Sequence, residues 1–229
     1  MHRTPNLQIA DLRKGYLEAG RVHAVLEGVD LTVHSGERVA VLGPSGSGKS
    51  TILNLISGID RADGGTIEVG GVRLDGLSER DRTIFRREKI GFVFQAFNLI
   101  STLTVLENLL LPLELKGKLT PHHTERAQGL LEDVGLAHRA DAFPDRLSGG
   151  ERQRIAVARS LVHEPTLILA DEPTGSLDED RGERIVDLLE EMTQSRDGSL
   201  LLVTHSTDLA ARMDRVVRLT HGRLVEESR

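Results

Sequence analysis

GPSGSGKST at residues 43–51 and LSGGE at residues 147–151 are the two stretches that decide the fold. The first fits the phosphate-loop pattern G-x-x-x-x-G-K-[ST] and follows an apolar run, residues 38–42, that is typical of a buried strand. From average residue usage, a chance match in such a chain has a probability of about 1% for the first pattern and about 0.01% for the second. Both together, in this order, indicate a protein built around nucleotide phosphates.

The composition fits one domain with a sizeable core, because the chain has 229 residues, of which 38% are hydrophobic and 28% charged. No stretch approaches the ~20 apolar residues of a membrane span, and the start, MHRTPNLQIADL, lacks the apolar centre of a signal peptide. We therefore expect membrane association only through a partner. The absence of cysteine excludes disulfides and cysteine-based metal sites. A net charge of −6 and few aromatic residues predict no binding to nucleic acid.

Apolar runs predict two kinds of strand. An antiparallel edge is expected from residues 7–12, 25–33 and 67–69. Buried parallel strands are expected from residues 39–42, 167–170 and 200–203, and a closing hairpin from residues 216–219 and 223–225.

The pattern turns helical between residues 104 and 162. Thr104 and Glu107 fit a capping box, Thr120 before a proline begins a second helix, and a third begins near Ser148. A fourth helix is predicted by apolar residues spaced on one face, among them Ile185, Leu188 and Leu189. We interpret these apolar faces as core.

The further motifs follow in a fixed order: an apolar stretch before Gln95, LILADE at residues 167–172, SLD at residues 176–178, and His205. The constellation resembles the ATP-binding subunits of ABC transporters over nearly the whole chain. The resemblance implies an α/β P-loop NTPase fold with a RecA-like core, an antiparallel β edge and an inserted helical subdomain. Residues 1–229 would form a single ABC ATPase domain. Its nucleotide-binding core would comprise residues 1–92 and 163–229, and its Q-loop and helical subdomain about residues 93–162.

The phosphate loop is expected to bind ATP. Its glycines leave backbone N–H groups free to point at phosphates just before a helix N-terminus, and Lys49 adds a positive charge for the β and γ phosphates. The Ser50 hydroxyl suits Mg²⁺, and Thr51 reaches the α phosphate. The nucleotide-binding residues expected here are Gly43, Ser45, Gly46, Ser47, Gly48, Lys49, Ser50 and Thr51.

Two carboxylates, Asp171 and Glu172, end an apolar strand at the sheet edge where ligands of open α/β sheets bind. Alone, such a pair could equally face solvent. The resemblance implies that Asp171 holds Mg²⁺ and that Glu172 is the general base. It also implies that Gln95 senses Mg²⁺ or the attacking water and that His205 contacts the γ-phosphate. An isolated Gln is usually a surface residue, however, and an isolated His at a strand end is more often structural.

LSGGE provides an anion site without a lysine, because Ser148 can cap the next helix while Gly149 and Gly150 expose their N–H groups. The resemblance implies that this incomplete site closes on the ATP of a second copy, which gives an ATP-dependent, head-to-tail homodimer. Asp178 would lie across that interface. Tyr16, the single tyrosine, would stack on adenine; the alternative is a plain surface tyrosine.

Residues 86–117 and the segment TGSLDEDRGERIVDLL resemble most the branch of the family with the MacB, LolD and FtsE types. This implies a subunit on the cytoplasmic face of the cell membrane that drives an integral membrane permease. One alternative is an FtsE-like regulatory ATPase without transport. A soluble ABC ATPase of DNA repair or translation is disfavoured, because the chain has no coiled-coil or zinc insertion. Ser206 and Glu151 depart from the residues common in this branch.

Overall fold

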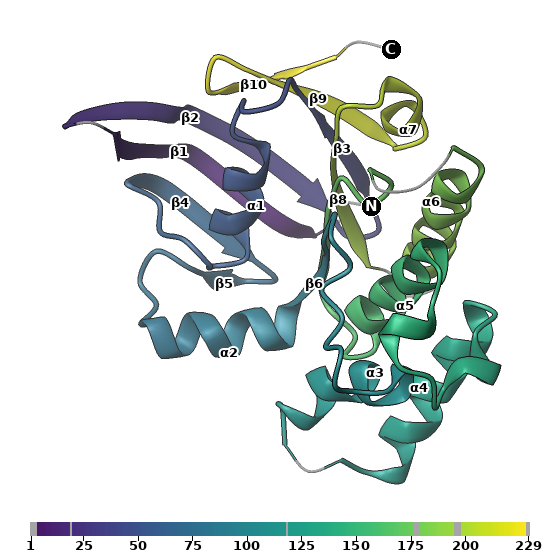
Figure 1. Cartoon of the computed structure of the whole chain (residues 1–229). Helices are drawn as coiled ribbons and strands as arrows, with labels where there is room; N and C mark the ends of the chain where they lie inside the picture. Colours follow the sequence, from purple (N-terminus) through teal and green to yellow (C-terminus); the bar gives the residue numbers. More distant parts are fainter. Residues whose placement is uncertain (1–3, 19, 118, 176–178, 195–197, 228–229) are drawn as a thin grey trace.

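The predicted strands form two separate sheets in the computed structural model, which describes residues 4–18, 20–117, 119–175, 179–194 and 198–227 (Figure 1). The antiparallel sheet has the order β2-β1-β4-β5, and the larger, mainly parallel sheet has the order β10-β9-β3-β8-β7-β6. The antiparallel sheet contains β1 (Pro5–Glu18), β2 (Arg21–His34), β4 (Gly64–Val69) and β5 (Val72–Arg73). The parallel sheet contains β3 (Arg38–Leu42), β6 (Ile90–Val93), β7 (Leu167–Asp171), β8 (Ser199–Thr204), β9 (Arg215–Thr220) and β10 (Arg223–Glu226).

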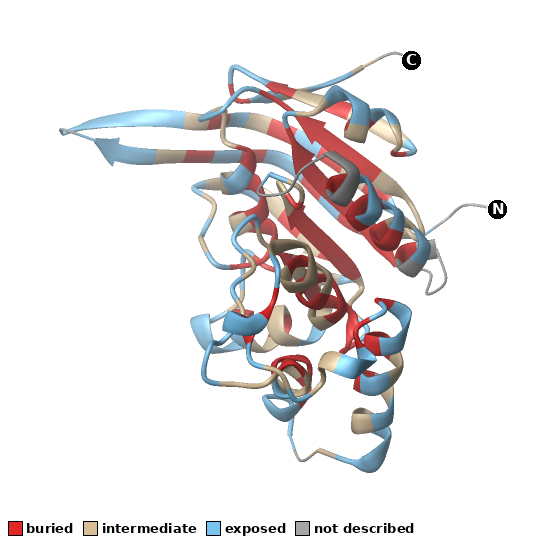
Figure 2. Cartoon of the chain, turned by 45° about the vertical axis from the view of Figure 1, so that its right-hand side comes forward, coloured by how far each residue is buried: buried red, intermediate tan, exposed pale blue. Residues whose placement is uncertain are grey.

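The parallel sheet is buried on both faces, which explains why its strands are continuous apolar runs. In β3, Val39 and Val41 belong to one hydrophobic cluster and Ala40 and Leu42 to the other. The residues of β7 and β8 alternate in the same way. Figure 2 shows these central strands as mostly buried, whereas the far end of the β1–β2 hairpin projects away from the core and is exposed.

The helix that follows the phosphate loop, α1 (Lys49–Ile56), packs in the cluster shared by the two sheets (Figure 1). Its buried side chains Ile52, Leu53, Leu55 and Ile56 join residues from the antiparallel sheet and from β3. This helix is therefore fixed on both sides, and the position of its N-terminus is set by the core.

The opposite cluster connects the parallel sheet with the helical segment: α3 (Val105–Glu114), α4 (Pro121–Asp133), α5 (Gly149–Leu161) and the short helices η1 (Ala137–Arg139) and η2 (Pro144–Arg146). Both reciprocal hydrogen bonds of the predicted capping box join Thr104 and Glu107. Because α3, α4 and α5 share one apolar cluster with β7 and β8, the helical segment is anchored to the sheet. The division at residues 93 and 162 stays a prediction.

Three more helices complete the described chain. In α6 (Glu179–Gln194), Ile185, Leu188 and Leu189 are buried, as the apolar spacing predicts. The short α7 (Thr207–Ala211) follows β8. The sequence gives little indication of α2 (Glu79–Lys89), because it is mostly charged and buries only Arg82 and Phe85.

A buried histidine predicts a loss of stability in mild acid. His163, just after α5, bonds through Nε2 to the carbonyl oxygen of Ile90 at 2.9 Å. Burial is the main reason that its pKa is lowered from 6.5 to about 4. The unfolded chain takes up a proton below about pH 6.5 and the folded chain does not, so the stability is complete above that pH and falls as pH decreases toward about 4. The full loss is on the order of 3 kcal/mol.

We expect His163→Gln to remove about 2 kcal/mol of the difference in unfolding free energy between about pH 7.5 and pH 5, as measured by urea denaturation. His138→Gln offers a matched control, because it makes the same chemical change at a histidine that is exposed in the fold. If the pH profile of His163→Gln equals that of the parent chain, the folded protein takes up a proton on this imidazole as readily as the unfolded chain does, and the prediction is wrong.

Candidate active site

The phosphate loop packs closely against β2 and β9, and its glycines permit this close approach. Gly48 has a φ of 101°, and a Cβ there would lie 2.7 Å from Cγ1 of Val25 in β2. A Cβ at Gly43 would lie 3.0 Å from the carbonyl oxygen of Leu219 in β9. The Ser47 hydroxyl is buried without a hydrogen-bond partner among the described residues. An unsatisfied buried hydroxyl in this loop fits a phosphate oxygen as its partner.

Lys49 lies inside the same loop. Its ammonium group donates hydrogen bonds to the carbonyl oxygens of Gly43 at 2.8 Å and Pro44 at 3.0 Å, and the residue is only 7% exposed. These neutral carbonyl groups leave the positive charge without a counter-ion in the loop. A phosphate is the kind of ligand that supplies one.

Asp171 ends β7 beside the start of α1. The pKa of its carboxyl group is raised, mainly by burial and further by the charge of Glu172. A hydrogen bond with Ser50 and the charge of Lys49 act in the opposite direction and lower it. The site thus pairs a carboxylate with a hydroxyl, and both are hard oxygen ligands of the type that Mg²⁺ prefers. Two of the three residues predicted to contact the metal, Ser50 and Asp171, are therefore brought together.

Glu172 and His205 also meet, although 33 positions separate them in the sequence. Nδ1 of His205 lies 2.7 Å from Oε2 of Glu172. The backbone supports this arrangement, because Glu172 donates its N–H to the carbonyl oxygen of Val203 in β8 and has a φ of 46°. A positive φ is unfavourable for a residue other than glycine, and such strain is common where a side chain must point into a functional site. The His205 side chain is 68% exposed and is accessible to a ligand.

Gln95 follows β6 and reaches the turn after Glu172. A Cβ on Gly175 would lie 3.0 Å from Nε2 of Gln95, and the N–H of Gly175 donates to the carbonyl oxygen of Glu172. The amide group is therefore at the same sheet edge as the two carboxylates, as the sequence predicts.

The LSGGE segment forms a different hollow. Ser148 caps α5 by accepting from the N–H of Glu151, whose carboxylate accepts the N–H of Ser148 at 2.8 Å. Ser148 and Gly150 line a cavity of about 180 Å³ together with two cations that the sequence does not single out, Arg154 and Arg184. No residue of the phosphate loop lines it. Within one chain, the two predicted anion sites are thus separate.

The comparison with protein-family models matches residues 26–175 to the ABC transporter family. The chain belongs to this family. Because its relatives include ATP-binding proteins of this family and a cassette bound to ADP and Pi, this ABC protein binds and hydrolyses ATP. Its fold is the α/β P-loop fold of ABC ATPase cassettes.

Curated relatives cover almost the full length of this ABC ATPase. It is 48% identical to an uncharacterised ABC transporter ATP-binding protein of Mycobacterium tuberculosis, over 98% of this chain and 91% of the relative. It is 46% identical to the lipoprotein-releasing system ATP-binding protein LolD of Pseudomonas syringae, over 96% of this chain and 97% of the relative. These alignments confirm the predicted resemblance to the branch with LolD.

A solved structure is similar as well. It is described as the dimeric ATP-binding cassette MJ0796 in a post-hydrolysis state bound to ADP and Pi. The TM-score is 0.88 at 37% identity, and the match covers 97% of this chain and 98% of that one. The predicted fold class is therefore confirmed.

Tyr16 of this ABC ATPase lies beside the start of α1, where a base would have to sit near the phosphate loop. Burial and Asp60 raise the pKa of its hydroxyl, and a hydrogen bond with Thr51 opposes them. The hydroxyl donates to the Asp60 carboxylate at 2.8 Å, and Nζ of Lys14 lies 4.9 Å from the ring centre. The predicted stacking on adenine stays a prediction. Asp60, which holds the ring in place, was not apparent from the sequence.

Two remaining sequence features have different outcomes. Ser206 caps α7 by accepting from the N–H of Leu209, so serine at this position stabilises the helix after His205. Asp178 lies outside the described residues, and its predicted place across a dimer interface stays a prediction.

Arg159, the last arginine of α5, holds the segment that carries Gln95. Arg159 donates to the carbonyl oxygens of Asn98 at 2.6 Å and Phe97 at 3.1 Å. Nothing in the sequence distinguishes it from the other arginines of this helix. It makes α5 a direct link between the LSGGE segment at its N-terminus and the loop after β6.

We expect Arg159→Met to lower the kcat of this ABC ATPase by about ten-fold, because small shifts of a positioning loop reduce catalysis. ATP affinity should be preserved, since no predicted phosphate ligand is touched. Arg126→Met is a matched control, because Arg126 also donates to two carbonyl oxygens near the same end of α5, but these belong to Leu161 and Val162 and not to the loop after β6. Equal kcat values for the two variants would contradict the proposed link.

Proposed function

We propose that this ATPase drives a membrane permease of the MacB/LolCDE-like export or extraction type, and that ATP joins two copies of the ATPase head to tail. In this proposal the phosphate loop of one copy faces Ser148, Gly149 and Gly150 of the other. The observation that carries it is the separation of the two anion sites, because the LSGGE hollow contains no residue of the phosphate loop. A site split in this way is completed by a second copy.

The similar proteins support both parts of the proposal. The described cassette MJ0796 is dimeric, and the relative from Pseudomonas syringae is the ATP-binding protein of a lipoprotein-releasing system. Within the described residues, no helix is long and apolar enough to cross a membrane. In this proposal, a permease supplies the membrane-spanning part, and the ATPase lies on the cytoplasmic face.

The contacts of the site fit ATP hydrolysis. Lys49 would neutralise the β and γ phosphates, and Oε2 of Glu172 would accept a proton from the attacking water. His205 would hold Glu172 through their 2.7 Å contact and present its ring to the γ-phosphate. Gln95 would orient the water from the loop after β6. Because positioning and charge compensation dominate phosphoryl transfer, these residues fit the half of the site that one chain would supply.

Mg²⁺ fits the pair formed by Ser50 and Asp171, with Gln95 as a further oxygen ligand. When bound, it would neutralise the charge that develops on the phosphate oxygens. This assignment rests on the hydroxyl and the carboxylate that the fold places side by side.

The proposal is tested by affinity purification from detergent-solubilised membranes. Tagged Glu172→Gln protein is purified with ATP present, and bound proteins are identified by mass spectrometry. Recovery of a permease with few membrane spans and a large extracytoplasmic domain would support the proposal. A permease with many spans and no such domain would indicate a conventional transporter. An envelope regulator would favour the FtsE-like alternative, and no membrane partner would contradict all three.

A further inference from the structure

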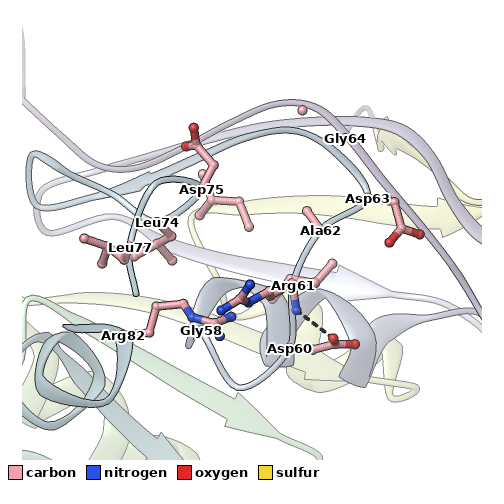
Figure 3. A pocket seen from close by; sticks show the side chains of 13 residues that line it. Gly58, Asp60, Arg61, Ala62, Asp63, Gly64, Leu74, Asp75, Leu77 and Arg82 are labelled. Atoms are coloured by element: carbon pink, nitrogen blue, oxygen red, sulfur yellow. Dashed lines mark hydrogen bonds between the residues drawn. The ribbon is translucent and has the colours of Figure 1, made fainter. Parts of the chain in front are cut away.

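A hollow of about 230 Å³ lies at the end of α1 that is remote from the phosphate loop (Figure 3). The segment after α1, the β4–β5 hairpin and α2 enclose it. Its wall contains the apolar side chains of Leu55, Ile67 and Leu74 and the cations Arg61 and Arg82. None of the predicted ATP-binding residues that the structure describes lines it.

Arg82 is the unusual member of this wall. The residue is 7% exposed, and its Nε and Nη1 are buried without a hydrogen-bond partner among the described residues. Its aliphatic stem is held against Gly58, where a Cβ would lie 3.5 Å from the Cβ of Arg82. A buried guanidinium without a counter-ion is unfavourable, so proteins rarely retain one unless a partner completes it.

The carboxylates that line the hollow already have partners. Asp60 accepts from Lys14 at 3.0 Å and from the Tyr16 hydroxyl at 2.8 Å. Asp75 accepts from Arg73 through both carboxylate oxygens, at 3.3 and 2.9 Å. Within the described part of the chain, neither carboxylate forms a hydrogen bond or an ion pair with Arg82.

The third lining carboxylate, Asp63, accepts the backbone N–H of Gly15 at 2.7 Å. Arg86 adds a further positive charge beside the three lining carboxylates. Arg86 donates to the carbonyl oxygen of Gly58 at 3.2 Å, and its pKa is lowered by burial and by the charge of Arg82. Figure 3 shows the side chains of Arg61 and Arg82 pointing toward one another, and no ion pair of either is found within the described part of the chain.

We propose that this hollow is a binding site for a small organic anion whose phosphate or carboxylate group pairs with Arg82 and Arg61. Guanidinium groups match both kinds of anion. Leu55, Ile67 and Leu74 would pack against an apolar body. A cavity of about 150 Å³ holds benzene, so this one accommodates a ring of that size together with its anionic group. The site adjoins the nucleotide site through Asp60, which lines the hollow and binds Tyr16.

The test uses phenyl phosphate and benzoate as probes, with saturating ADP to occupy the phosphate loop. Proton saturation transfer from the full chain to the probe ring reports binding. We expect transfer from the parent protein to at least one probe, and an affinity lower by at least about ten-fold in Arg82→Met. Arg80→Met is the matched control, because Arg80 is exposed on the same helix, and it should bind as the parent does.

A second variant, Ala62→Leu, adds volume at the wall of the hollow and keeps Arg82. This variant should also weaken binding of the probe. Thermal unfolding of each variant is measured to test whether its fold is intact. Transfer to phenyl phosphate alone would identify a phosphate ligand, and transfer to benzoate alone a carboxylate. No transfer to either probe at ~10 mM, or equal binding by the parent and Arg82→Met, would overturn the proposal.

Discussion

The variant Glu172→Gln is expected to lose ATP turnover by about 10²- to 10⁴-fold, because an amide cannot accept the proton of the attacking water. ATP binding should persist, since the phosphate loop around Lys49 is untouched. The amide is similar in size to the carboxylate and can still contact His205, which lies 2.7 Å from Glu172 in the parent chain. Steady-state phosphate release measures the loss, and nucleotide binding is measured separately.

The same variant is expected to remain an ATP-bound dimer at micromolar concentration, because ATP joins the copies and is no longer removed. Size-exclusion chromatography with light scattering measures the mass with ATP and with ADP. Glu88→Gln is a suitable control, because Glu88 is an exposed residue of α2, and this variant should retain parental turnover. A Glu172→Gln protein that stays monomeric with ATP would count against the head-to-tail arrangement.

The fold was predictable where residue type and spacing leave few alternatives. The apolar runs of β3, β7 and β8 indicated strands buried on both sides, and the structure shows this burial. The capping boxes at Thr104 and Ser148 fixed two helix starts, because side chains that satisfy free N–H groups are a local property. Local chemistry of this kind needs no tertiary information.

Other features depend on contacts that no local pattern contains. α2 is mostly charged, and its buried Arg82 contradicts the usual exposure of arginine, so neither the helix nor the hollow was apparent. The positive φ of Glu172 is also hidden in the sequence, because it occurs where this residue bonds to Val203, a segment distant along the chain. The identity of the site residues followed from motifs, but their orientation required the fold.

Arg154 and Arg184 illustrate the same limit at the LSGGE hollow. The motif alone predicted an anion site without a positive side chain, whereas the structure adds two arginines to its wall. Arg184 comes from α6, far along the chain, so only the packing of α5 with α6 reveals it. The hollow is therefore more positive than the motif indicated, which favours a phosphate as its ligand.

Two inactive variants are expected to restore activity when they are mixed. Lys49→Ala removes the charge of the phosphate loop, and Ser148→Arg fills the LSGGE hollow, so each homodimer should be inactive. In a head-to-tail mixed dimer, one site contains both defects, and the other combines an intact phosphate loop with an intact LSGGE segment. Random association makes half of the dimers mixed, so the mixture should recover roughly one quarter of parental turnover.

A second mixture provides the control. Lys49→Ala and Glu172→Gln both damage the half of the site that the phosphate loop and β7 build within one chain. Each site of that mixed dimer keeps one defect, so its turnover should stay at the level of the separate variants. Recovery in the first mixture alone requires that Lys49 and Ser148 of one site come from different chains. If neither mixture recovers activity, either each chain contains a complete site or the dimer needs two intact sites for any turnover. A covalently linked dimer with one Ser148→Arg half distinguishes these explanations. It retains activity only if each chain contains a complete site.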